Sequence, residues 1–358
     1  MRIGIIAANS LWVSPYVFYY TKLLDELGLD YEIVAPDRTP NEKEAYNSRL
    51  VTLPWDPRKH TLFNYIRYSG DVRKLALERY DYLIILTTLN GVFCCPWLKK
   101  HFDRRYILDI RDYTHENLPA YFALERSAVR HSALNMISSS KFQTFLPKAD
   151  YQVCHNITTP PRTEDFHFQR SEGRIVIGYV GLIAYEEQCR RLMELIHGDD
   201  RFAFYFYGTG PAETALRAYA ETLHEPRIQF FGAYQPSEKG EIIQKTDILF
   251  NAYGNETASV RCLLANKLYD ALYYHKPLLT SPGTFMAEMG GELAFSSELS
   301  DRTALDQLWS WYQALDPARA DAYASERYAA LLAEQRNTNE TVKRVLLRQI
   351  CERAGEGA

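Results

Sequence analysis

The sequence predicts an α/β protein with two similar halves, on the strength of two observations. Short apolar runs alternate with helix-length amphipathic segments, and this alternation stops at a pair of prolines near residue 160 and then starts again. Apolar runs that are too short for helices are typical of strands covered on both faces, as in a parallel sheet. Strands that alternate with helices imply right-handed βαβ units. A length of 358 residues also favours two domains, each able to bury a core.

Seven apolar runs of the first half are the expected strands: 3–7, 31–35, 50–53, 82–86, 106–110, 134–138 and 151–155. Helices are expected at 15–27, 62–79 and 120–131. The most apolar stretch, 82–98, is interrupted by Thr87, Thr88, Asn90 and Pro96. We interpret it as a buried strand followed by a packed helix, because a membrane span needs about 20 apolar residues.

Pro160 and Pro161 mark the expected linker, since two adjacent prolines continue neither a helix nor a central strand. We therefore place one Rossmann-like domain at 1–160 and a second at 161–335. Residues 336–358 are expected to form a C-terminal helix, for which packing back on the first domain is one option.

The second half repeats the alternation. Strands are expected at 175–180, 202–207, 228–231, 248–251 and 277–280, with 293–295 as a further candidate. Helices are expected at 186–197, 212–223, 260–274 and 237–244, the last with Ser237 as its cap, and the tail from Thr303 is typical of helices. In such folds ligands bind beyond the carboxyl ends of the strands, which places a site in the cleft between the two halves.

Bulk properties exclude several classes of protein. The net charge of −4 argues against nucleic acid as a partner. The N-terminus lacks the pattern of a signal peptide, and the six cysteines are scattered without a C-x-x-C pair. We therefore expect reduced, buried thiols and a cytoplasmic location.

Four segments of the second half resemble glycosyltransferases of the GT-B fold, and specifically the family 4-like group that builds bacterial surface polysaccharides. These segments are 178–181 (GYVG), 204–211 (FYFYGTGP), 227–232 (RIQFFG) and 266–279 (NKLYDALYYHKPLL). The last is the most specific, because it is similar to the signature helix of that family and the strand that follows it. The resemblance covers essentially the whole chain and is stronger in the second half.

The resemblance implies two Rossmann-like domains that face a central cleft, with C-terminal helices closing on the first domain. The first domain then serves the acceptor, and the second binds a nucleoside diphosphate sugar linked to UDP or GDP. Asp270 stands where the family has an acidic residue, more often glutamate, that binds the ribose hydroxyls. Lys267 and Arg261 are expected at the diphosphate, together with free N–H groups at the helix start. The expected donor-binding set is Gly181, Gly208, Arg261, Asn266, Lys267 and Asp270.

Two departures from the family pattern concern the mechanism. Cys262 stands where the family often has a second glutamate, for which Asn255 or Glu256 are candidate replacements. The loop at 182–188 has no basic residue, which leaves Arg190 and Arg191 as further candidates for countercharge beside Arg261 and Lys267. The alternative interpretation is that Asn266 and Lys267 are solvated and that Asp270 is a surface carboxylate.

In the first half, ionisable residues follow the expected strand at 106–110. Asp112, His115 and Glu116 are the candidate catalytic residues, as base or as contacts to sugar hydroxyls. Asp109 and Arg111 in the same segment are equally well explained as a pair that anchors loops. After the first strand, Asn9, Ser10 and Trp12 are candidates for hydrogen bonding and stacking with an acceptor sugar, with plain packing as the alternative for Trp12.

No metal or cofactor is expected. The chain has no Asp-x-Asp motif and no cluster of histidines and cysteines at ligand spacing. The GTGP turn at 208–211 lacks the third glycine of a dinucleotide fingerprint and follows the second strand of its half, which argues against an NAD site. The charge of the leaving diphosphate is then expected to be met by helix N-termini and basic side chains.

Two stretches mix aromatic and basic residues and are candidates for contact with anionic lipid at the inner leaflet of the membrane. The first contains Trp55, Arg58, Lys59, Phe63, Tyr65, Arg67, Tyr68, Arg73 and Lys74, and the second contains Trp97, Lys99, Lys100, His101, Arg104 and Arg105. The alternative is a solvated helix face.

The expected function is a metal-independent transfer of a hexosyl or related group from a nucleotide sugar to a hydroxyl group of a glycan or lipid-linked acceptor, in surface polysaccharide synthesis. Two alternatives stay open. One is a sugar-nucleotide epimerase on the same fold, which turns over its substrate without an acceptor. The other is a transferase-like subunit that binds without catalysis, which Cys262 and the absence of basic residues near Tyr185 leave open.

Overall fold

The computed structural model describes residues 1–9, 11, 14, 16–38, 49–159 and 165–356. The chain divides into two compact units. Unit 1 contains Met1–Asn156 and Ala333–Ala358, and unit 2 contains Ile157–Leu332. The sequence had placed its boundaries at 160 and 335.

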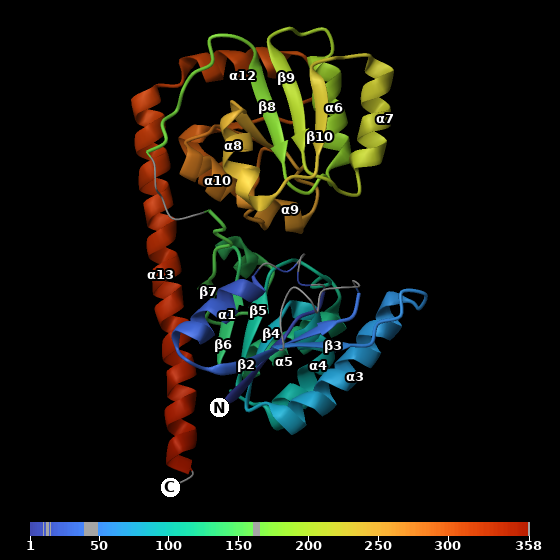
Figure 1. Cartoon of the computed structure of the whole chain (residues 1–358), viewed down its shortest axis with the longest axis vertical. Helices are drawn as coiled ribbons and strands as arrows, with labels where there is room; N and C mark the ends of the chain where they lie inside the picture. Colours follow the sequence, from blue (N-terminus) through green and yellow to red (C-terminus); the bar gives the residue numbers. More distant parts are fainter. Residues whose placement is uncertain (10, 12–13, 15, 39–48, 160–164, 357–358) are drawn as a thin grey trace. The chain divides into compact units, whose positions relative to one another are not determined.

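Unit 1 is built on a seven-stranded parallel sheet with the strand order β3-β2-β1-β4-β5-β6-β7 (Figure 1). The strands are β1 (Arg2–Ile6), β2 (Asp30–Pro36), β3 (Leu50–Leu53), β4 (Tyr82–Leu86), β5 (Tyr106–Ile110), β6 (Leu134–Ile137) and β7 (Gln152–Val153). The central strands β4 and β5 are buried along their whole length. Such burial explains why they are continuous apolar runs in the sequence.

Helices cover both faces of this sheet. Helix α1 (Val17–Glu26) and the last part of α13 (Pro317–Glu356) belong to one apolar core, to which they contribute Tyr20, Leu24, Val342 and Leu346. Helices α3 (Thr61–Arg79), α4 (Thr88–His101) and α5 (Pro119–His131) pack side by side across the sheet from α1 (Figure 1). A short 3₁₀ turn, η3 (Ser140–Thr144), follows β6.

Unit 2 contains a six-stranded parallel sheet with the order β10-β9-β8-β11-β12-β13. Its strands are β8 (Ile175–Val180), β9 (Phe202–Tyr207), β10 (Ile228–Gly232), β11 (Ile248–Asn251), β12 (Leu278–Thr280) and β13 (Ala294–Ser296). Successive strands are added outward from β8 in one direction and then, from β11 onward, in the other. The carboxyl ends of β8 and β11 therefore form the switch point at which ligands bind in doubly wound sheets.

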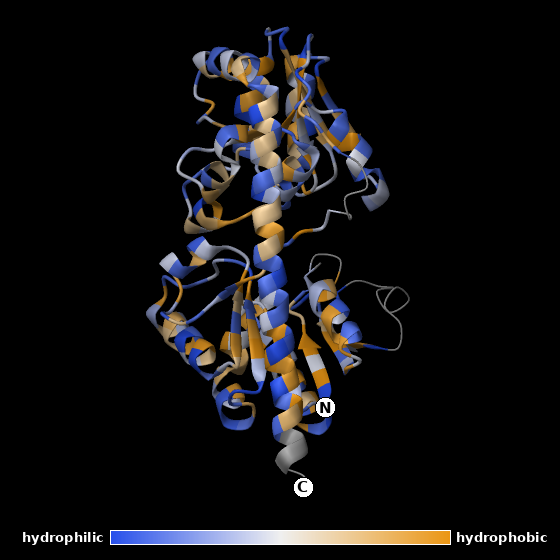
Figure 2. Cartoon of the chain, turned by 90° about the vertical axis from the view of Figure 1, so that its left-hand side faces the viewer, coloured by the Kyte–Doolittle hydropathy of each residue, from blue (hydrophilic) through white to orange (hydrophobic). Residues whose placement is uncertain are grey.

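The helices of unit 2 are α6 (Glu186–Ile196), α7 (Glu213–Leu223), α8 (Lys239–Gln244), α9 (Ala258–Cys262), α10 (Asn266–Tyr274), α11 (Phe285–Gly290) and α12 (Thr303–Ala314), with the 3₁₀ turns η4 (Pro236–Glu238) and η5 (Gly291–Leu293). They enclose an aromatic-rich core in which Phe204, Phe206 and Phe250 are completely buried. Figure 2 shows the apolar residues concentrated in the strands of each sheet.

Three predictions about local structure are wrong. The helix expected at 260–274 is two helices, α9 and α10, because Leu263 and Ala265 adopt extended backbone angles between them. Ser237 does not cap the helix at 237–244, since Gln235 and Glu238 form the capping box there. Cys262 is partly exposed and Cys351 is exposed, so only four of the six thiols are buried as expected.

The C-terminal helix α13 is longer than the helix expected at 336–358. It runs for 40 residues, from Pro317 to Glu356, and passes from unit 2 into unit 1 at residue 333. Polar and apolar residues alternate along it (Figure 2). Within the described part of the chain, no helix combines the length and the apolar character needed to cross a membrane.

Candidate functional site

Two glycine turns shape the switch point of unit 2. Gly181 ends β8 with a φ of 118°, and Gly208 ends β9 with a φ of 128°. A Cβ atom on Gly208 would collide with the carbonyl oxygen of Gly181. The two turns therefore touch backbone to backbone, which only glycine permits at position 208. As a result, the space above the end of β8 stays open to the side chains of α10.

Lys267 reaches this space from the first turn of α10. Its Nζ lies 3.9 Å from the place a Cβ of Gly181 would occupy and donates a hydrogen bond of 2.6 Å to Tyr253 Oη, just after β11. It also lies 4.5 Å from the centroid of the Tyr179 ring. Lys267 is only 6% exposed, and burial lowers its pKa to about 8, against the opposing effect of Asp270. A buried cation without a bonded carboxylate thus stands at the switch point.

Asp270 lies one turn further along α10 and is 3% exposed. Lys239, the first residue of α8, donates a hydrogen bond of 2.7 Å to its Oδ1. Burial raises the pKa of Asp270, and the nearby Lys239 opposes this shift. Within the described part of the chain, the bond from Lys239 to Oδ1 is the side-chain contact that Asp270 makes, and it leaves Oδ2 available. One carboxylate oxygen is therefore held in place while the other is unused.

The far end of α10 is fixed by residues that take no part in the site. His275 adopts the left-handed conformation that ends the helix, and its Nδ1 lies 2.7 Å from Asp321 Oδ1 on α13. Lys276 donates to the carbonyl oxygens of Gln244 and Thr246. These contacts tie the end of α10 to α13 and to the end of α8, and they set the orientation of α10 in the unit.

Not all members of the expected donor-binding set come together. Gly181, Gly208 and Lys267 meet at the end of β8, and Asp270 and Asn266 lie on the same helix as Lys267. Arg261 lies on α9, where its exposed guanidinium donates to the carbonyl oxygens of Asn255 and Glu256. Arg261 thus braces the preceding loop, and it lies on a different helix from Lys267, whereas the sequence had placed both on one helix over 260–274.

The other candidates for countercharge are already engaged. Arg190 and Arg191 pair with Glu186 and Glu187 one turn earlier on α6. The amide group of Asn255 donates to Pro282 O and to Glu298. The sequence pointed to none of the contacts that the site does show, those of Lys239 and Tyr253. Lys239 lies 31 positions from Asp270, and nothing in its own segment distinguishes it from a surface lysine.

In unit 1, the three candidate catalytic residues follow the carboxyl end of β5. Asp112 and His115 are exposed, and the His115 ring packs edge-on against Tyr121 at 5.5 Å. Glu116 is buried: its Oε2 accepts a hydrogen bond of 2.6 Å from the backbone N–H of Thr114, and its Oε1 has no partner. Asp112 and His115 are therefore accessible to solvent, whereas Glu116 holds the loop through Thr114.

Glu125 on α5 was not foreseen as part of this region. It is completely buried, and neither carboxylate oxygen has a hydrogen-bond partner among the residues that the structure describes. Burial, reinforced by the nearby Glu116, raises its pKa to about 8. The carboxyl group therefore keeps its proton at neutral pH. A lone glutamate on an amphipathic helix gives no sign of this in the sequence.

The remaining candidates of unit 1 divide into two groups. Asp109 and Arg111 form a buried ion pair of 2.7 Å, and Asp109 also accepts a hydrogen bond from Tyr20, which is the loop-anchoring arrangement considered from the sequence. Ser10 and Trp12 lie outside the described residues. Asn9 is described, and its side chain is bound to Arg38.

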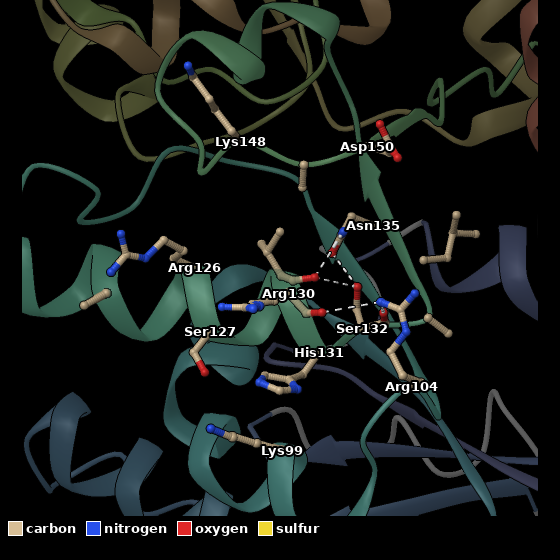
Figure 3. Close-up of a pocket in the computed structure, with 15 residues that line it drawn as sticks. Lys99, Arg104, Arg126, Ser127, Arg130, His131, Ser132, Asn135, Lys148 and Asp150 are labelled. Atoms are coloured by element: carbon tan, nitrogen blue, oxygen red, sulfur yellow. Dashed lines mark hydrogen bonds between the residues drawn. The ribbon is translucent and has the colours of Figure 1, made fainter.

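The two aromatic and basic stretches differ in exposure. In the first, Tyr65 and Tyr68 are buried, which removes them from any lipid-facing surface, whereas Phe63 is 52% exposed. In the second, Lys99 and Arg104 line an open pocket of about 860 Å³ with Arg126, Arg130 and Lys148 (Figure 3). Arg104 there donates to the carbonyl oxygens of Arg130 and Ser132. Part of this basic charge therefore stabilises the C-terminal end of α5.

No protein-family profile and no curated protein sequence matches the chain. Solved structures do. Sucrose-phosphate synthase from Thermosynechococcus elongatus superposes over the full length of both chains with a TM-score of 0.72 at 12% identity. Anabaena HepE in complex with UDP covers 97% of this chain and 100% of its own, with a TM-score of 0.69 at 13% identity. The lipopolysaccharide outer core galactosyltransferase WaaB covers 96% and 100%, with a TM-score of 0.64 at 14% identity.

Identities this low establish the fold alone. The match spans both sheets of the chain, because it covers 97–100% of its residues. The chain thus has the GT-B fold found in glycosyltransferases, as the sequence predicted.

Proposed function

We propose that this protein is a glycosyltransferase that moves a sugar from a nucleoside diphosphate sugar to a hydroxyl group of a glycan or lipid-linked acceptor. The observation that carries the proposal is the pairing of Lys267 and Asp270 on α10. A buried cation stands over the Gly181 turn, and a held carboxylate with one unused oxygen lies one turn further along the helix. The UDP bound by the structural neighbour HepE supports this assignment.

Each group has a chemical role in this proposal. The Lys267 ammonium and the N–H groups at the start of α10 meet the charge of the diphosphate, which grows as the sugar–phosphate bond breaks. Asp270 accepts a hydrogen bond from a ribose hydroxyl through Oδ2, while Lys239 opposes the rise of its pKa on burial. Asp112 and His115 in unit 1 contact the acceptor hydroxyl, and one of them receives its proton. Because Lys267 and the helix N–H groups meet the charge of the diphosphate, the proposed reaction needs no divalent metal.

Selective loss of affinity tests the ribose assignment. Asp270→Ala should weaken the binding of UDP and GDP at least tenfold, a loss of roughly 1.4 kcal/mol, and leave inorganic pyrophosphate binding unchanged, because pyrophosphate has no ribose. Lys267→Met should weaken both UDP and pyrophosphate. Isothermal titration calorimetry in excess EDTA measures each of these affinities for the variants and the unaltered protein. It tests at the same time whether binding is independent of metal.

Three results would count against the proposal. Unchanged nucleotide affinity in Asp270→Ala would remove the ribose assignment. Binding or activity that appears only with Mg²⁺ would remove the metal-free account. Turnover of a nucleotide sugar in the absence of any acceptor would favour an epimerase. A thermal-shift panel of UDP- and GDP-sugars identifies the donor to be used, because a ligand that binds the native state raises the melting temperature.

The proposal extends to a role in surface polysaccharide synthesis on the cytoplasmic side of a membrane, which the structural similarity to WaaB supports. The surface in favour of membrane contact is the start of α3. Leu62, Phe63 and Ile66 are each more than half exposed there. Residues 56–74 contain five lysines and arginines against two aspartates. An exposed apolar face flanked by cations suits an anionic lipid surface.

A further inference from the structure

Three neighbouring strands of unit 1 end in residues that contact one another. Asn9 follows β1, Arg38 follows β2 and Trp55 follows β3, and these strands are adjacent in the order β3-β2-β1. Because the strands are parallel, the three residues lie at the carboxyl edge of the sheet, where ligands bind in this class of fold. The site described above does not include Arg38 or Trp55.

Aromatic rings hold the Arg38 guanidinium on one side. Its Cζ lies 3.7 Å from the centroid of the Trp55 ring and 5.5 Å from that of Tyr65. Nη1 donates to Asn9 Oδ1 at 2.7 Å, and Nη2 donates to Tyr65 Oη at 3.2 Å. Tyr65 in turn stacks on Phe93 of α4, with the ring planes 6° apart. The guanidinium is therefore fixed in direction by two hydrogen bonds and a stacked ring.

The charge of Arg38 is not matched by any carboxylate of the described residues. Arg111, Arg201 and Arg227, which are also buried or partly buried, each pair with an aspartate or glutamate. Arg38 is half-buried, and its Nε is shielded from solvent without an acceptor. Asn9 and Tyr65 are neutral partners, so the positive charge of Arg38 is left uncompensated by the described residues and is available to a bound anion.

The chemistry of the cluster narrows that anion. A guanidinium has five N–H donors. Asn9 and Tyr65 occupy two of them and the Nε–H is shielded, which leaves one N–H on each of Nη1 and Nη2 for a carboxylate or phosphate. The flat face of an indole suits the apolar face of a sugar ring. The guanidinium and the indole lie in contact, with the Arg38 Cζ 3.7 Å from the centroid of the Trp55 ring. We propose that Arg38 and Trp55 form a subsite for an acidic saccharide, a sugar that carries a carboxylate or phosphate group, on the acceptor side of the reaction.

This inference rests on the proposed transferase function, because it specifies the acceptor of that reaction. It requires the acceptor to be anionic close to the sugar ring that Trp55 contacts. Two sources supply such a charge, a uronic acid or a sugar phosphate. A neutral sugar with the same ring has neither the carboxylate nor the phosphate, so its affinity is the reference for the two charged sugars.

Ligand-observed NMR titrations on the full chain test the subsite without the need for catalysis. The probes are methyl β-glucuronide, glucose 6-phosphate and methyl β-glucoside. One or both anionic probes should bind at least tenfold more tightly than the glucoside, and the tighter of the two identifies the anionic group. Arg38→Met should abolish this preference, and Arg38→Lys should retain part of it, because an ammonium keeps the charge but not the fork. Trp55→Ala should weaken all three probes.

Arg58→Met is the matched control. Arg58 is an exposed arginine close by in the sequence, paired with Asp56, and its loss should leave all three affinities unchanged. Equal binding of charged and neutral probes by the unaltered protein, or no binding of any, would overturn the subsite whether or not the variants fold. UDP binding separates the two proposals: it should be intact in Arg38→Met. Failure of the unaltered protein to bind any nucleotide would refute the donor site instead.

Discussion

Burial and the groups on five surrounding elements control the charge of Lys267. Tyr253 and Tyr179 face its Nζ from the ends of β11 and β8, Cys189 faces it from α6, and Asp270 and Lys239 act from α10 and α8. Burial raises the pKa of both tyrosines and of the cysteine, so all three are neutral near pH 8. Lys267 therefore titrates with its pKa lowered to about 8, within reach of ordinary buffers.

Nucleotide affinity should consequently depend on pH. Below pH 8 Lys267 carries the charge that attracts the diphosphate, and the diphosphate of UDP keeps its charge above pH 7, since its second phosphate pKa is about 6. Ionisation of the uracil N3–H at the alkaline end affects the unaltered protein and the Lys267→Arg control alike. The UDP dissociation constant should be flat near pH 7 and rise above pH 8, by up to about tenfold per unit until the raised pKa of the complex is passed. Calorimetric titrations between pH 7 and 9.5 measure this. Lys267→Arg is the control, and an identical rise in that variant would refute the assignment.

The effect of Lys267 on the stability of the fold has the opposite pH dependence from its effect on UDP affinity. The folded pKa of Lys267 lies below its unfolded value of about 10.4, so the unfolded chain binds more protons between pH 8 and 10.4. This group alone therefore makes the fold more stable as the pH rises through that window. Weaker UDP binding at pH 9 is thus not explained by loss of the folded state through Lys267.

Single residues also show where prediction from sequence stops. The spacing of Lys267 and Asp270 on one helix follows from their positions, because residues three apart lie on the same face. The contacts with Lys239 and Tyr253 come from separate strands and helices, and no local pattern encodes them. Among the described residues, Arg38 lacks a carboxylate partner and Glu125 lacks any hydrogen-bond partner, and neither fact can be known before the fold is.

At the scale of elements, strands were more predictable than helix ends. Buried parallel strands are continuous apolar runs, so the 82–86 and 106–110 predictions agree with β4 and β5. The break between α9 and α10 was missed because Leu263, Leu264 and Ala265 continue the apolar pattern without glycine or proline. Helix ends are set by hydrogen bonds such as the Thr257 cap, which many sequences could form elsewhere.

Helix α3 carries a prediction of its own. Leu62, Phe63 and Ile66 are 52%, 52% and 53% exposed. Their insertion into a lipid interface removes this apolar surface from water, which favours binding. Replacing all three with serine should reduce binding to vesicles of anionic phosphatidylglycerol roughly tenfold or more, as measured by co-sedimentation.

The matched control replaces Leu77, Leu124 and Leu347 with serine. These leucines are 54%, 40% and 45% exposed and lie elsewhere on unit 1. Equal losses in both triple variants would show that general hydrophobicity, and not the start of α3, governs binding. Weak, equal binding of the unaltered protein to anionic and neutral vesicles would exclude membrane contact through this surface.

At the scale of the whole molecule, the two units have separate hydrophobic cores. Ile84 on β4 is completely buried in the core of unit 1, and Leu249 on β11 is completely buried in that of unit 2. Each is an aliphatic side chain whose truncation to alanine costs about 2–5 kcal/mol. Because no residue is shared between the two cores, the two costs are expected to add when both substitutions are combined.

Nucleotide binding should act on one core only. The proposed donor groups all belong to unit 2, so UDP at a hundredfold excess over its dissociation constant should stabilise that unit by about 2.7 kcal/mol. Scanning calorimetry with and without UDP measures the effect on Leu249→Ala and Ile84→Ala. The ligand should raise the transition that Leu249→Ala lowers, and leave the transition that Ile84→Ala lowers in place. A UDP-dependent shift confined to the transition that Ile84→Ala lowers would show that the nucleotide binds unit 1. The donor and acceptor would then have to exchange units in the proposed reaction.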